Sequence, residues 1–263
     1  MAPSGSTTDV AARLRRASGL ARSLVIYHGN PLRRIQARRH YGAFVKPGDL
    51  CFDIGAHLGD RVRAFTHLGA RVVALEPQPR IMTVLRRFYG RHPAVTLVEA
   101  AAGAKPGRAS LQVSQGTPTL STLSEDWRRQ VSANRRFAGA RWQERVEVQV
   151  TTLDALIAAH GRPDFCKIDV EGFEAEVLAG LSRPLPALSF EVIPAAPEQA
   201  AACLERLAQL GPYRFNISLG ERKRLIFDDW RDRRDLEAWL AARGPNEPSG
   251  DVYARLGDGH TIP

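Results

Sequence analysis

Residues 50–59 read Leu50-Cys51-Phe52-Asp53-Ile54-Gly55-Ala56-His57-Leu58-Gly59. This stretch decides the fold, because a short apolar run ends in a carboxylate and a glycine-containing loop then leads into a helical pattern. The next apolar run, residues 71–75, is followed by a second acid, Glu76, and then by Pro77. The sequence therefore predicts two neighbouring strands that each end in a carboxylate, at the edge where open α/β sheets bind their ligands.

The acid at the start of the loop favours a cationic ligand. Dinucleotide sites present bare backbone N–H groups and a helix N-terminus to a pyrophosphate, which a carboxylate would repel. Asp53 lies two residues before the first glycine, and Gly55-x-x-x-Gly59 differs from the G-x-G-x-x-G pattern of those sites. The loop suits an ammonium or sulfonium group, and S-adenosylmethionine carries both; Glu76 is placed to accept hydrogen bonds from its two ribose hydroxyls. Asp-x-Gly is also ordinary turn chemistry, so the prediction depends on both acids together.

The composition is that of a globular protein with one sizeable core. The 263 residues are 44% hydrophobic and 25% charged, and no apolar run approaches the roughly 20 residues that span a bilayer. The first ten residues lack the apolar segment of a signal peptide, so we expect a cytoplasmic location. The three cysteines, Cys51, Cys166 and Cys203, have no metal-ligand spacing and are expected to be reduced core residues.

The net charge of +9 comes mainly from residues 1–47, which hold nine Arg and Lys residues against one acid. We expect a basic helical N-terminal extension there, broken near residues 29–31, and a single domain over residues 48–263. Leu32 and Ile35 are among the apolar residues expected to form an amphipathic face. Such an arm could contact nucleic acid, an anionic membrane surface or an acidic partner; the alternative is a solvated helical arm.

From residue 50 onward, apolar strands alternate with helical patterns of about ten residues. Strands are predicted at residues 50–54, 71–75, 95–99, 165–169, 187–193, 213–219 and 251–256. Helices are predicted at about residues 59–68, 81–88, 152–160, 173–180, 197–210 and 232–242. This alternation predicts an α/β fold, with a seven-stranded mostly parallel sheet, helices on both faces and an antiparallel last pair. That is the arrangement of a Rossmann-like class I methyltransferase.

A polar insert interrupts the alternation at about residues 103–150. Residues 109–114 and 145–150 are predicted to form a hairpin around a segment that contains Trp127 and Trp142 and several arginines. A long polar insert with aromatic residues is typical of a substrate-facing lid. The alternative is a surface hairpin that only bridges the sheet.

A second cluster of acids follows the strand predicted at residues 165–169. Asp169 and Glu171 project from one turn beside Lys167, and Asp169 is expected to meet Asp53 at the carboxyl edge of the sheet. Either acid could remove a proton from an acceptor hydroxyl, with Lys167 tuning the local charge. The pair could instead hold Mg²⁺, but no third ligand is evident, and we predict no metal. Glu171 could also cap the following helix.

With both acid clusters described, the chain resembles the FkbM family of S-adenosylmethionine-dependent methyltransferases over roughly residues 48–193. The matching segments are residues 52–60, 74–77, 99–103, 152–156 and 167–178, and residues 250–254 resemble the family's last strand. Lys167-Ile168-Asp169-Val170-Glu171-Gly172 is the most specific of these. The N-terminal arm and residues 115–145 lie outside the match, so acceptor choice is expected to reside there.

The resemblance implies O-methylation of a hydroxyl group on a sugar, polyketide or other natural product, with a small-molecule or glycan acceptor. It also implies that Asp53, Gly55 and Gly59 contact the methionine part of the cofactor, Glu76 the ribose, and Glu99 to Ala101 the surroundings of the adenine. The remaining predicted cofactor-binding residues are Ile54, Ala56, His57, Pro77, Ala100 and Asp169. Asn is common in the family where His57 stands, and a backbone role is expected for His57 rather than catalysis.

Three other functions each agree with part of the sequence. A nucleic-acid methyltransferase is prompted by the basic arm, but base-amino methylation usually needs an Asn/Asp-Pro-Pro-aromatic loop where this chain has Lys-Ile-Asp-Val-Glu-Gly, so we expect no nucleic-acid substrate. A non-catalytic binding protein on the same fold is disfavoured by the intact acids Asp53, Glu76 and Asp169. An NAD(P) oxidoreductase is disfavoured by the chemistry of the loop that begins at Gly55.

Overall fold

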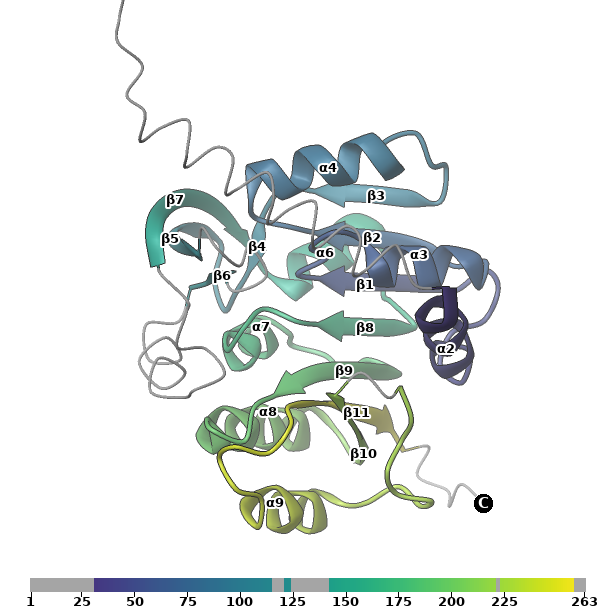
Figure 1. Cartoon of the computed structure of the whole chain (residues 1–263), viewed down its shortest axis with the longest axis vertical. Coiled ribbons are helices and arrows are strands. Elements are labelled where there is room, and N and C mark those ends of the chain that lie inside the picture. The colour runs from purple at the N-terminus through teal and green to yellow at the C-terminus, as the bar shows by residue number, and fades with distance from the viewer. Residues whose placement is uncertain (1–30, 115–120, 124–141, 221–222, 258–263) are drawn as a thin grey trace, which may run out of the picture.

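The structure is a computed structural model of the chain, and it describes residues 31–114, 121–123, 142–220 and 223–257. Its centre is a seven-stranded sheet with helices on both faces (Figure 1). The strands run in the order β10-β11-β9-β8-β1-β2-β3. Their bounds are β1 (Leu50–Ile54), β2 (Arg71–Leu75), β3 (Val95–Val98), β8 (Phe165–Ile168), β9 (Ala187–Val192), β10 (Tyr213–Leu219) and β11 (Gly250–Leu256).

Strand direction agrees with the predicted topology. β1, β2, β3, β8 and β9 pair in parallel, whereas β11 lies between β9 and β10 and is antiparallel to both. The predicted antiparallel last pair is thus confirmed. Since the carboxyl ends of the parallel strands share one edge, the loops after β1, β2 and β8 converge there.

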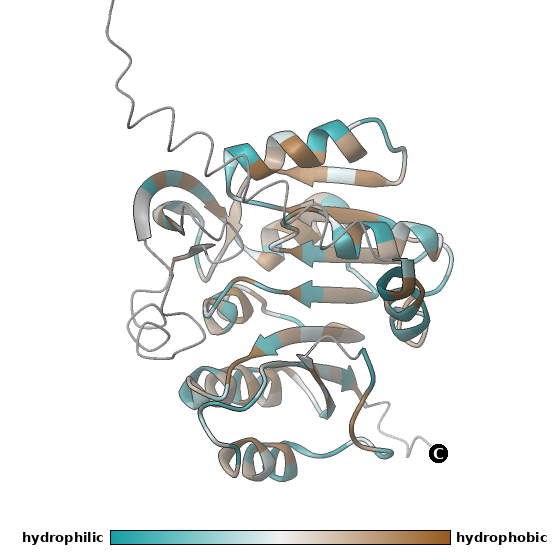
Figure 2. Cartoon of the chain, viewed as in Figure 1, coloured by the Kyte–Doolittle hydropathy of each residue, from teal (hydrophilic) through white to brown (hydrophobic). Residues whose placement is uncertain are grey.

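Two layers of helices cover the sheet, and each buries an apolar side against it. One face carries α2 (Pro31–Tyr41), α3 (Asp60–His67) and α4 (Pro79–Tyr89). The other carries α6 (Leu153–His160), α7 (Glu174–Ala179), α8 (Pro197–Leu210) and α9 (Arg233–Ala241). Figure 2 shows the apolar strands between these helices and hydrophilic residues on the helices' outer sides. In the part of the chain that the structure describes, no helix is both long and apolar enough to cross a bilayer.

The predicted hairpin is part of a second, small sheet. Its strands are β4 (Ala101–Ala102), β5 (Gly107–Ser114), β6 (Ser121–Thr122) and β7 (Trp142–Thr151), in the order β4-β7-β5-β6. The predicted hairpin is confirmed as the antiparallel pair β5–β7. Figure 1 shows this sheet beyond the end of the main sheet toward which β1 and β8 point. Most of the predicted lid lies outside the described residues, namely residues 115–120 and 124–141.

The predicted N-terminal extension is described only from residue 31 onward, and this part packs into the domain. Tyr41, on α2, is fully buried, and its ring makes edge contacts with Phe65 and Phe165. The predicted apolar face was wrong for Leu32 and Ile35, which are 67% and 64% exposed. The helix instead turns Ala37, His40 and Tyr41 inward, because the aromatic cluster on the domain offers more contact area on that side.

Candidate active site

A cavity opens at the carboxyl edge of the main sheet, and Leu111 of the small sheet also lines it. The loops after β1, β2 and β8 line it, together with the segment after β3 and the end of β9. Among the predicted site residues, those that line it are Asp53, Ile54, Gly55, Ala56, His57, Glu76, Pro77, Ala100, Ala101, Asp169 and Glu171. Gly59, Glu99 and Lys167 are not among its lining residues. The structure therefore brings the two predicted acid clusters into one cavity.

Asp53 ends the buried strand β1 and is 1% exposed. Its Oδ2 atom is buried and has no hydrogen-bond partner among the described residues. Burial raises the pKa of this carboxyl to about 7, although the nearby cations Arg61 and Lys167 oppose the shift. A buried acceptor that lines a cavity and lacks a partner is costly unless a ligand supplies one.

The turn after Asp53 requires glycine for close packing between two loops. Gly55 has φ +84°, and a Cβ at this position would lie 1.9 Å from the backbone oxygen of Asp169. The backbone N–H of Asp169 also donates to the oxygen of Ile54 at 2.9 Å. Gly55 therefore allows the loops after β1 and β8 to touch. Gly59 serves another purpose, because its φ is +80° and its oxygen accepts from the Tyr89 hydroxyl at 3.0 Å.

Glu76 is buried at the end of β2 and fixes two backbone amides. Its Oε2 accepts from the N–H of His57 at 3.0 Å and its Oε1 from the N–H of Gln78 at 2.9 Å. Burial raises the pKa of Glu76 to about 7, and hydrogen bonds from these two amides and from the Gln78 side chain partly oppose the shift. A carboxylate offers about four acceptor sites, so Glu76 keeps the capacity to accept from ribose hydroxyls. The backbone role expected for His57 agrees with its position, since its φ is +46° and its N–H holds Glu76.

Of the residues after β3 that were predicted to surround the adenine, only some line the cavity. Ala100 and Ala101 line the cavity. The carboxylate of Glu99 instead forms an ion pair with Arg86 at 2.7 Å. The side chain of Glu99 thus lies with α4, while the small residues that follow it give the cavity an apolar wall.

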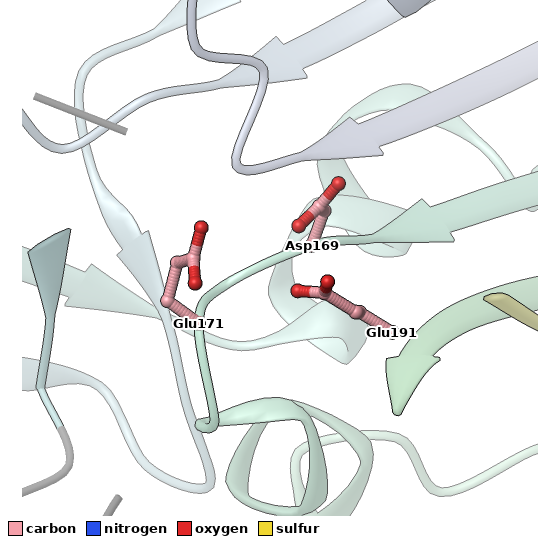
Figure 3. Close-up of side chains that lie close together, drawn as sticks. All are labelled: Asp169, Glu171 and Glu191. Atoms are coloured by element: carbon pink, nitrogen blue, oxygen red, sulfur yellow. The ribbon is translucent and has the colours of Figure 1, made fainter. Parts of the chain in front are cut away.

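Three carboxyl groups meet beside the loop after β8: Asp169, Glu171 and Glu191 (Figure 3). Oxygens of the three lie within 4.8 Å of one another, close enough to share one cation. Glu191, on β9, is the third acid that the sequence analysis missed. The available signal was a charged residue near the carboxyl end of an otherwise apolar strand, the one predicted next after residues 165–169.

The suggestion that Glu171 caps the following helix was wrong. Glu171 has φ +54°, and α7 begins only at Glu174. The Oε1 of Glu174 accepts from the N–H groups of Val170 and Gly172 at 3.0 and 3.3 Å. Because Glu174 satisfies these amides, Glu171 is left to face the cavity, which it lines.

The charges around the three acids differ. Asp169 Oδ2 lies 3.4 Å from the Nζ of Lys167 and 3.7 Å from a guanidinium nitrogen of Arg61. Glu171 and Glu191 have no such cation in contact in the described part of the chain; burial and the neighbouring acids raise the pKa of both well above its usual range. One proton shared between these two carboxyls relieves their repulsion.

The fold and this cavity define a Rossmann-like class I S-adenosylmethionine-dependent methyltransferase. The sequence model of the methyltransferase FkbM domain matches residues 53–242, and the chain belongs to this family. The residues present fit the cofactor, because the unpartnered oxygen of Asp53 and the remaining acceptor capacity of Glu76 suit a cation and a ribose. No protein with curated annotation matches the chain significantly.

Several solved methyltransferase structures are similar to the chain. Precorrin-6y C5,15-methyltransferase from Geobacter metallireducens is 15% identical, with a TM-score of 0.44, over 85% of this chain and 87% of that one. A TehB-like methyltransferase from Corynebacterium glutamicum is 11% identical, with a TM-score of 0.48, over 92% and 98%. An O-methyltransferase from Thermotoga maritima is 13% identical, with a TM-score of 0.41, over 84% and 64%. At these values the similarity carries no information about the acceptor.

The raised pKa of Asp53 predicts that Asp53→Asn makes the protein more stable but weakens donor binding. Replacing Asp53 with Asn should stabilise the donor-free protein at pH 8 by on the order of 3 kcal/mol, because it removes a buried charge whose folded pKa, about 7, exceeds the ordinary 3.8. The gain should shrink as the pH falls below 7, where Asp53 in the folded protein takes up a proton. Melting curves at pH 5.5 and pH 8 measure this difference.

The same curves with S-adenosylmethionine added complete the test. The donor should raise the melting temperature of the parent protein more than that of Asp53→Asn, because only the parent offers a carboxylate to the donor's cation. A variant that is less stable than the parent at pH 8 would contradict the burial of an uncompensated charge.

Proposed function

We propose that the protein is an O-methyltransferase that acts on a hydroxyl of a sugar, a polyketide or a related natural product. The observation that carries this proposal is the cluster of Asp169, Glu171 and Glu191 at the cavity. An oxygen acceptor must lose its proton during transfer, and a carboxylate within reach can take it. The small-molecule acceptor is supported by the acidic lining, which would repel a phosphate backbone.

The proposed cofactor contacts follow the cavity wall. Asp53 and the backbone around Gly55 hold the methionine part, Glu76 accepts from the ribose hydroxyls, and Ala100 and Ala101 face the adenine. Bound S-adenosylmethionine supplies a methyl group on a sulfonium centre, which is already a strong electrophile. The protein's task is then to align the acceptor oxygen with that methyl group and to receive a proton.

We assign proton removal to Glu171. The raised pKa of the Glu171–Glu191 pair narrows the gap to the pKa of a hydroxyl, which makes the ionised member a better base than an ordinary carboxylate. Asp169 is neutralised by Lys167 and Arg61, so we assign it to orienting the acceptor hydroxyl by a hydrogen bond. Lys167 does not line the cavity, and it acts through Asp169.

Isotope-labelled donor tests the proposal directly. The protein is incubated with methyl-labelled S-adenosylmethionine and a metabolite extract of the source organism, and products are analysed by mass spectrometry. We expect label on the oxygen of a small molecule or glycan. Label on nucleic acid or on nitrogen would reject the proposal, and so would turnover that depends on RNA. Parallel reactions with EDTA and with Mg²⁺ show whether the acid cluster uses a cation.

The acid pair predicts the direction of a pH shift. The rate should rise with pH as Glu171 ionises, and Glu191→Gln should move this rise to lower pH because it removes a negative neighbour that raises the pKa of Glu171. The measurement is the initial rate of methyl transfer to the extract between pH 5 and 9 with EDTA present. Glu205→Gln, on the exposed side of α8, is the control and should leave the profile unchanged. An unshifted Glu191→Gln profile would contradict the assignment.

A further inference from the structure

Asp251 lies outside the cavity but is joined to it by one side chain. It is on β11, the antiparallel strand, where its register partner on β9 is Glu191. Its Oδ1 accepts from the Nζ of Lys167 at 2.9 Å. Lys167 is fully buried, and Asp251 is 9% exposed. The pair therefore links the last strand of the sheet to the strand that carries the Lys167–Gly172 motif.

The three N–H donors of the Lys167 ammonium match three nearby oxygens. Besides Asp251, it donates to the backbone oxygen of Ile168 at 3.1 Å and pairs with Asp169 Oδ2 at 3.4 Å. A buried ammonium keeps its charge only when such partners compensate for lost hydration. Asp251 provides the shortest of these contacts, so it holds the ammonium on the side away from the cavity while Asp169 meets it from the cavity side.

We propose that Asp251 is a positioning residue for methyl transfer: it fixes the ammonium of Lys167 and thereby the orientation of the Asp169 carboxylate in the cavity. Asp251 is not among the residues that line the cavity, so it acts through Lys167 and touches neither donor nor acceptor. The inference rests on the proposed role of Asp169. The proposal gives a function to the contact between Lys167 on β8 and Asp251 on β11, two residues that are 84 positions apart in the chain.

The charged surroundings of Lys167 define a readout that a purely structural role would not move. Asp169 and Asp251 face its ammonium and raise its pKa, whereas burial and Arg61, on α3, lower it; the Tyr41 hydroxyl, on α2, also faces it. Lys223 faces Asp251 from the segment after β10. Removing the charge of Asp251 leaves the donor-binding residues intact, so a positioning role slows methyl transfer at an unchanged donor Kd, whereas a general loss of structure would change both.

The test is Asp251→Asn, which keeps the shape of the side chain and removes its charge. At saturating donor we expect the rate of methyl transfer to the extract to fall by about 10–100-fold, with the calorimetric Kd for S-adenosylmethionine changed by less than about threefold. Asp164→Asn is the matched control, because Asp164 accepts from the N–H of Leu50 at the opposite end of β1; it should keep the parent rate and donor Kd.

A second comparison remains valid if Asp251→Asn folds poorly. Because Asp251 acts through Lys167, adding Asp251→Asn to Lys167→Met should cost no further rate beyond Lys167→Met alone. A further loss would overturn the proposal, as would a parent-like rate in a folded Asp251→Asn protein. Asp169→Asn separates the role of Asp169 from that of Asp251. If Asp169→Asn keeps the parent rate, the proposed role of Asp169 is wrong. If Asp169→Asn is slow but Asp251→Asn keeps the parent rate, only the positioning role of Asp251 is rejected.

Discussion

Glu76→Ala should reduce the affinity for S-adenosylmethionine by about 100- to 10,000-fold. Two hydrogen bonds from ribose hydroxyls to one buried carboxylate contribute roughly 1.5–3 kcal/mol each, and every 1.4 kcal/mol is tenfold. The substitution also releases the amides of His57 and Gln78, which Glu76 holds at 3.0 and 2.9 Å. Isothermal calorimetry with donor alone measures the effect without knowledge of the acceptor.

Glu99→Ala is the matched control for this loss. It removes the same functional group from the end of the neighbouring strand, but the carboxylate of Glu99 pairs with Arg86 instead of lining the cavity. Its donor affinity should stay within about twofold of the parent, the range of an exposed ion pair. Unchanged donor affinity in Glu76→Ala would refute the ribose assignment. A large loss of donor affinity in Glu99→Ala would mean that the Glu99 side chain does take part in binding the adenine.

Asp169→Ala should lose turnover beyond any loss of donor affinity. Misplacing an acceptor oxygen by about 1 Å costs on the order of 100-fold, and the loss of a group at the reacting hydroxyl costs about 100- to 10,000-fold. The rate at saturating labelled donor should therefore fall by at least about 100-fold, while calorimetry shows a smaller change in donor Kd. If the two losses were equal, Asp169 would only bind the cofactor.

The control for Asp169→Ala is Asp154→Ala. Asp154, in the first turn of α6, accepts from the N–H of Ser182 and does not line the cavity. It tests whether the loss of a loop-fixing carboxylate slows the reaction through the fold alone. We expect the Asp154 variant to melt earlier than the parent and to keep its rate.

The local sequence pattern was sufficient to predict the strands of the main sheet. The bounds predicted for β1, β2, α8 and β10 agree with the structure to the residue, because apolar runs end there at glycine, proline or an acid. Both acid clusters of the cavity were also predicted, since strand order alone brings the loops after β1 and β8 to one edge. The alternative that Glu171 caps the following helix was wrong, because Glu174, one turn later, satisfies the backbone amides there.

Contacts that depend on strand order and register could not be predicted from the sequence. Glu191 joins the cluster because β9 lies next to β8, and Asp251 reaches Lys167 because β11 inserts between β9 and β10. Neither residue has a partner nearby in the chain that would reveal its role. The face of α2 was misjudged for a related reason: the helix pattern includes Leu32 and Ile35, but the ring of Tyr253, which stacks edge-on with His40, comes from the other end of the chain.

The insertion of β11 between β9 and β10 also sets the order of events during synthesis. Until the ribosome has made residues 250–256, β10 has no neighbour within the main sheet, and the β9 edge beside it stays open. The ammonium of Lys167 likewise lacks Asp251 over the whole of that interval. A nascent chain that stops short of β11 thus exposes unpaired edges on β9 and β10 and lacks the shortest contact of the Lys167 ammonium, which is the kind of intermediate that chaperones retain.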